Sequence, residues 1–77
     1  MTIYEIIKKI KDTEEIDFNV DFIESKLFDS LDIMTLVEEL EKQYDCKIKG
    51  IDIMPQNFAN VGTIRELVVK SGGSIDE

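Results

Sequence analysis

Residues 30–44 read SLDIMTLVEELEKQY, a run without glycine or proline that predicts a helix of about four turns. On a helical wheel, five large side chains gather on one side and form the expected core stripe: Ile33, Leu36, Val37, Leu40 and Tyr44. Leu31 and Met34 fall outside the centre of this stripe, so we expect both to be partly exposed. The helix should therefore pack one face on a core and present two apolar side chains near its start.

The N-terminal segment predicts another helix. Thr2 and Glu5 have the spacing of a capping box, in which each side chain satisfies a backbone N–H of the other's residue. Apolar residues then repeat at helical spacing: Ile3, Ile6, Ile7 and Ile10. We expect a helix from Ile3 to Lys11.

The C-terminal part predicts a last helix. Asn60 is a suitable cap, and Ser71-Gly72-Gly73 is expected to stop the helix. The apolar residues between them repeat at helical spacing: Val61, Ile64, Leu67 and Val68. We expect a short helical turn after Pro55, and a flexible tail over residues 71–77 that is frayed from Ser74 onward.

Residues 12–29 lack glycine and proline, and four of their apolar residues alternate with polar ones: Ile16, Phe18, Val20 and Phe22. Alternation is typical of a strand, but a lone strand has no partner to pair with in this chain. We therefore expect a long ordered loop whose apolar residues fill the core.

These elements predict an all-α fold, a small bundle of three to four helices with a long loop between the first two. The length of 77 residues allows a single domain over 1–77, with no room for a second core. Seven residues are expected in the core: Ile6, Ile10, Phe22, Val37, Leu40, Ile64 and Leu67.

The charge is unevenly distributed. The net charge is −8, and residues 12–45 hold twelve acidic residues and only two lysines. Such a surface disfavours nucleic acids and anionic membranes, and it favours a partner with a basic patch. No run of residues is long and apolar enough for a membrane span, and the N-terminus is too charged for a signal peptide. We therefore expect a cytoplasmic protein.

Histidine is absent and Cys46 is the single cysteine. The usual Ser-His and Cys-His catalytic pairs, and a Cys/His zinc site, cannot be built from this chain. We predict that the protein is not an enzyme, that it holds no metal, and that Cys46 is a small core or surface residue rather than a reactive thiol.

Ser30 lies between two aspartates, in the stretch FDSLD at residues 28–32. Serine and aspartate both cap exposed backbone N–H groups at a helix start, so Ser30 could be only a capping residue. It could also be a hydroxyl that another protein modifies. The motif itself leaves both interpretations open.

The motif Asp29-Ser30-Leu31, followed by the helix IMTLVEELEKQY, resembles the acyl carrier protein family. The similarity also covers the preceding KLFD and the segment NFANVGTIRELV, and so extends over nearly the whole chain. The resemblance implies that Ser30 is the attachment site of 4′-phosphopantetheine. A separate phosphopantetheinyl transferase would install this arm from coenzyme A with Mg²⁺.

The resemblance also implies partners and cargo. An acyl or aminoacyl group would be carried as a thioester, loaded by a ligase and passed to an acyltransferase or synthase, with a monomeric carrier. Leu27-Phe28-Asp29-Ser30 is similar to the L-L-D-S or L-I-D-S of D-alanyl and peptidyl carriers. Carriers of fatty acid synthesis commonly have a glycine two residues before the aspartate, and acids where this chain has Thr35 and Lys42. D-Alanine, another amino acid and a non-fatty acyl group stay open as cargo, and a non-carrier acidic helical interaction module is the alternative.

Partner enzymes are expected to dock at the start of the helix that begins at Ser30. Leu31 and Met34 would supply the apolar contacts. The acidic rim is predicted to consist of Asp29, Asp32, Glu38 and Glu41.

Overall fold

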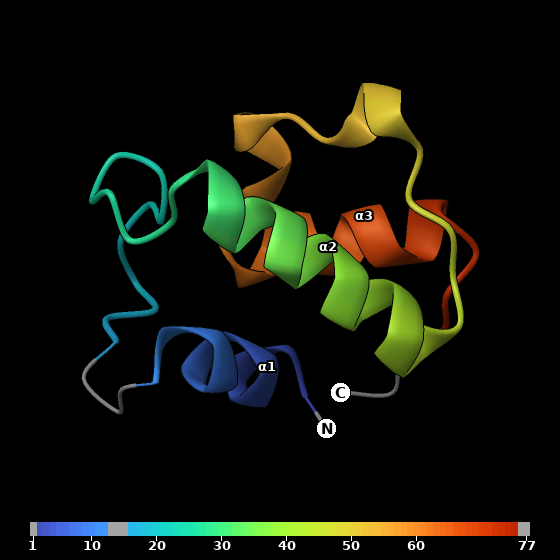
Figure 1. Cartoon of the computed structure of the whole chain (residues 1–77), viewed down its shortest axis with the longest axis horizontal. Coiled ribbons are helices and arrows are strands. Elements are labelled where there is room, and N and C mark those ends of the chain that lie inside the picture. The colour runs from blue at the N-terminus through green and yellow to red at the C-terminus, as the bar shows by residue number, and fades with distance from the viewer. Residues whose placement is uncertain (1, 13–15, 76–77) are drawn as a thin grey trace.

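The computed structural model describes residues 2–12 and 16–75, and it confirms the all-α fold class. The elements follow in the order α1 (Ile3–Lys11), α2 (Ser30–Tyr44), η1 (Gly50–Asp52), η2 (Pro55–Phe58) and α3 (Val61–Lys70), where η denotes a short 3₁₀ turn. The three α-helices pack against one another. The segment after α2 rises from the end of that helix and returns through η1 and η2 towards its start (Figure 1).

Capping boxes begin all three α-helices. The box of α1 uses Thr2 and Glu5, as predicted. In α2 the cap is Asp29, whose carboxylate accepts from the Asp32 N–H at 2.9 Å, so Ser30 is the first helical residue rather than the cap. The cap of α3 is Asn60, as expected. Each box satisfies N–H groups that a helix start would otherwise leave unpaired.

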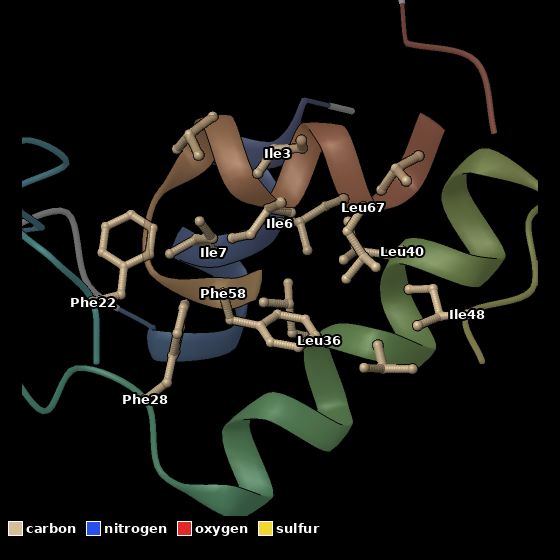
Figure 2. Packing of buried hydrophobic residues seen from close by; sticks show 14 residues of the cluster. Ile3, Ile6, Ile7, Phe22, Phe28, Leu36, Leu40, Ile48, Phe58 and Leu67 are labelled. Carbon is tan, nitrogen blue, oxygen red and sulfur yellow. The ribbon is translucent and has the colours of Figure 1, made fainter. Parts of the chain in front are cut away.

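Side chains from the three helices meet in one core, with Phe22 and Phe28 from the long loop at one end and Ile48 at the other (Figure 2). Six of the predicted core residues are buried there: Ile6, Phe22, Val37, Leu40, Ile64 and Leu67. The prediction was wrong for Ile10, which is half-buried at the edge of the core, as are Ile33 and Tyr44 of the expected stripe. All three lie in the first or last turn of a helix, where fewer neighbouring elements cover a side chain.

The long loop contributes aromatic side chains to the core, as expected. Phe22 packs edge-to-face on Phe28, with ring centroids 5.4 Å apart, and the Phe22 N–H donates to the Ala59 carbonyl at 2.7 Å. Val20 is 41% exposed and does not fill the core. The described part of this loop contains no strand, and the expectation for residues 13–15 lies outside the described residues.

Residues 71–75, the described part of the expected tail, contact the bundle after α3. The Gly73 N–H donates to the Val68 carbonyl at 2.9 Å, and Ile75 packs against the core. A Cβ atom added at Gly73 would lie 2.6 Å from Val68 Cγ1 and 3.2 Å from Tyr44 Cβ. The chain therefore passes so close to α2 and α3 that a side chain has no room. Residues 76–77 of the expected tail lie outside the described residues.

Gly73→Ala is expected to destabilise the fold by about 1–3 kcal/mol, because overpacking forces neighbouring groups to shift. Gly50→Ala is the matched control, since an added Cβ there meets nothing within 4 Å. Chemical denaturation of the two variants and the wild type measures the difference. Equal midpoints for both variants would contradict the close approach at Gly73.

Candidate functional site

Ser30 is the first residue of α2 and its side chain is exposed. Because Asp29 accepts the capping hydrogen bond, the Ser30 hydroxyl is not needed to start the helix. It forms no hydrogen bond with any described residue. The interpretation of Ser30 as only a cap therefore fails, and its hydroxyl is accessible for chemistry.

An apolar groove of about 220 Å³ adjoins Ser30. One side of the groove belongs to α2, and the other is a wall formed by residues 53–55, which run from the end of η1 to the first residue of η2. The lining residues are Ser30, Ile33, Met34, Ile53, Met54 and Pro55. A group attached to the serine hydroxyl would have an apolar surface to lie against.

Two apolar side chains near the start of α2 are exposed, as the helical wheel predicted, and one of them, Met34, lines the groove. Leu31 is 77% exposed and Met34 is 49% exposed. Met54, across the groove, is also exposed. Exposed apolar groups gathered at one place are typical of a contact surface for another protein.

Asp32, predicted as part of an acidic rim, already has a partner within the chain. The Lys11 ammonium of α1 donates to Asp32 Oδ2 at 2.8 Å, and the Asp29 N–H donates to the same oxygen at 3.2 Å. The hydrogen bond from Lys11 lowers the pKa of the Asp32 carboxyl below its ordinary value. Asp32 thus joins α1 to α2 through its ion pair with Lys11.

Glu41 also has a structural contact. It is half-buried, and its Oε2 accepts from the Ile48 N–H at 2.8 Å, which fixes the chain just beyond α2. Glu38 is exposed and pairs with no lysine or arginine of the described residues, and Asp29 is exposed as well as capping. The four predicted rim acids therefore divide into two that are exposed, Asp29 and Glu38, and two that are half-buried, Asp32 and Glu41.

Cys46 is half-buried, with its Sγ 3.8 Å from the Leu40 carbonyl oxygen. Burial raises the pKa of this thiol above its ordinary value, which disfavours the reactive thiolate at neutral pH. This agrees with the interpretation of Cys46 as a small packing residue. Within residues 2–12 and 16–75, no three His, Cys, Asp or Glu side chains gather closely enough to hold a metal ion.

A family model described as phosphopantetheine attachment site matches residues 2–68. This chain belongs to that family. It is a carrier domain of the acyl and peptidyl carrier class, and members of the family bind 4′-phosphopantetheine covalently. Searches of curated proteins and of solved structures gave no significant match.

The residues of this carrier domain fit such an arm. Ser30 offers an exposed hydroxyl that has no hydrogen-bond partner within residues 2–12 and 16–75, and the groove beside it offers apolar surface to a flexible chain. The start of α2 favours a phosphodiester, because the dipole of a helix is positive at that end. Family membership also disfavours the alternative of a non-carrier interaction module.

Sequence reasoning missed the second wall of the groove in this carrier domain. Ile53 and Met54 come from a segment without helical periodicity, which gave no indication of the face to which they belong. The available signal was Pro55, which starts a turn after an apolar run. In the described part of the carrier domain, no helix has the length and apolar character needed to cross a membrane.

Proposed function

We propose that Ser30 carries the 4′-phosphopantetheine arm and that the chain delivers an acyl or aminoacyl group to partner enzymes. The observation behind this proposal is an exposed serine hydroxyl at the start of α2, within the family match, that forms no hydrogen bond to another of the described residues. The other serines are less suitable. Ser25 donates to the Phe22 carbonyl, the Ser71 hydroxyl is buried, and Ser74 lies beyond α3 without a helix start.

The arm supplies a thiol that holds the cargo as a thioester. The chain itself presents the serine, shelters the attached group along the groove and offers a surface to other proteins. We propose that it contributes no catalytic residue and works as a cytoplasmic monomer over residues 1–77. Its partners would be a phosphopantetheinyl transferase, a ligase that loads the cargo, and a downstream acyltransferase or synthase.

The test is an intact-mass measurement of the full chain after incubation with coenzyme A, Mg²⁺ and a broad-specificity phosphopantetheinyl transferase. We expect the mass to increase by one arm per chain. A chain that stays unmodified while a known carrier is fully modified in the same mixture would overturn the proposal.

For the cargo, we propose D-alanine, another amino acid or a non-fatty acyl group. The support is the resemblance of Leu27-Phe28-Asp29-Ser30 to D-alanyl and peptidyl carriers. The mass of the thioester-bound group on protein isolated from its own cells would identify the cargo class. A long fatty acyl group would contradict this choice.

We propose that partners dock on Leu31 and Met34, with Asp29 and Glu38 as the principal charges that a basic partner meets. Asp32 and Glu41 belong to the predicted rim, but their contacts with Lys11 and Ile48 give them structural roles as well. Exposed charges mainly accelerate association, and this effect depends on salt. Buried apolar contacts mainly slow dissociation.

Glu38→Lys is expected to slow arm loading by the transferase and to weaken the dependence of the rate on salt. We choose Glu38 because Glu41→Lys would also remove the hydrogen bond to Ile48. The matched control is Glu66→Lys, which makes the same charge change at an exposed position of α3. Loading rates at two salt concentrations provide the measurement.

Met34→Ala provides a contrast, because it removes an apolar contact without changing any charge. We expect a higher KM for the carrier, with a salt dependence like that of the wild type. The electrostatic part of the docking proposal fails if Glu38→Lys and Glu66→Lys load at equal rates. The apolar part fails if Met34→Ala leaves the KM unchanged.

A further inference from the structure

Asp52, at the end of η1, is the only charged residue that is buried among those described, at 8% exposure. Its Oδ1 accepts from the Lys70 ammonium at 2.9 Å, and Lys70 is the last residue of α3. The Asp52 side chain is 12% exposed, whereas that of Lys70 is 67% exposed. A buried carboxylate is costly without a partner, so this pair ties η1 to α3.

The backbone of Asp52 ties the same point to η2. Its carbonyl accepts from Asn57 Nδ2 at 2.7 Å and from the Met54 N–H at 3.0 Å. Residues 53–55, the wall of the groove beside Ser30, follow directly in the chain. The carboxylate of Asp52 thus attaches one end of this wall to α3, while the backbone carbonyl of Asp52 stabilises the turn that follows.

Removing the Lys70 ammonium would leave the carboxylate buried without its ion-pair partner. Moving towards water lowers the free energy of a carboxylate in that state. Such a movement shifts the carbonyl of the same residue and, with it, Ile53 and Met54. The groove would then change shape although nothing at Ser30 had been altered.

We propose that Asp52 and Lys70 are a positioning pair, which fixes the wall of residues 53–55 and thereby sets how tightly partner enzymes bind at Ser30. This inference rests on the proposed function of Ser30. It assigns a role in partner binding to two residues outside the groove, neither of which belongs to the docking surface.

The test uses the full chain with three substitutions: Lys70→Gln, Asp52→Asn and Lys70→Arg. Lys70→Gln and Asp52→Asn are expected to raise the KM of transferase loading by about fivefold. This factor corresponds to the upper end of the free energies measured for solvent-exposed ion pairs. The kcat should stay close to that of the wild type, because the serine is unchanged. Lys70→Arg keeps the charge and the donor, so it should restore the wild-type KM.

Lys9→Gln is the matched control, because it breaks another ion pair, between Lys9 and Glu39 at 3.3 Å, which joins α1 to α2. We expect it to leave the KM unchanged. NMR of methyl-labelled methionine gives a second measurement, in which Lys70→Gln should shift the Met54 and Met34 resonances and Lys9→Gln should not. Lys70 is largely exposed, so its substitution should leave the fold intact even if Asp52→Asn does not fold.

A wild-type KM for Lys70→Gln would overturn the inference while leaving arm loading at Ser30 intact. Methionine resonances that do not move would overturn it as well. If the wild type carries no arm on Ser30, the proposed function fails instead, and the resonances still report whether the pair positions the wall.

Discussion

Ser30→Ala is expected to carry no phosphopantetheine at all after transferase treatment that fully modifies the wild type. The substitution removes the oxygen through which the arm would be attached. It should leave the fold intact, because Asp29 caps α2 and the Ser30 hydroxyl forms no hydrogen bond with any described residue. Alanine is also a favourable residue in the first turn of a helix. Intact mass spectrometry provides the measurement.

Ser25→Ala and Ser74→Ala are the controls for Ser30→Ala, and both should load fully. Circular dichroism should give the same helical content for all three variants and the wild type. An arm found on Ser30→Ala would show that another residue is the attachment site and would remove the main proposal.

Leu40→Ala is expected to lower the free energy of unfolding by about 2–5 kcal/mol, the usual range for truncating a buried leucine. Leu40 is fully buried in the middle of the core, where side chains from the three helices meet. The loss is a large share of the roughly 5–15 kcal/mol by which most domains are stable. Chemical denaturation followed by circular dichroism measures it.

Leu31→Ala is the matched control, because the same atoms are removed from a side chain that is 77% exposed on the same helix. We expect a change within about 0.5 kcal/mol, which is usual for surface substitutions. Similar losses for both variants would contradict the assignment of faces on α2.

The sequence by itself determined the features that depend on near neighbours in the chain. The three α-helices have the predicted bounds, and Thr2 and Asn60 indicated where α1 and α3 begin, because capping depends on residues only three apart. The buried faces followed from helical spacing, and Leu31 and Met34 are exposed for the same reason. The serine motif and the order of helices were enough to predict the family.

Only the tertiary structure decided the features that depend on residues far apart in the chain. Lys11 meets Asp32 across 21 positions, and Lys70 meets Asp52 across 18. No local pattern predicts such meetings, since they depend on how the helices and the segment after α2 pack together. The same packing left Ile10 at the edge of the core and brought Met54 beside Ser30. Local spacing determines which face a residue occupies, whereas the distance and angle between elements determine what that face meets.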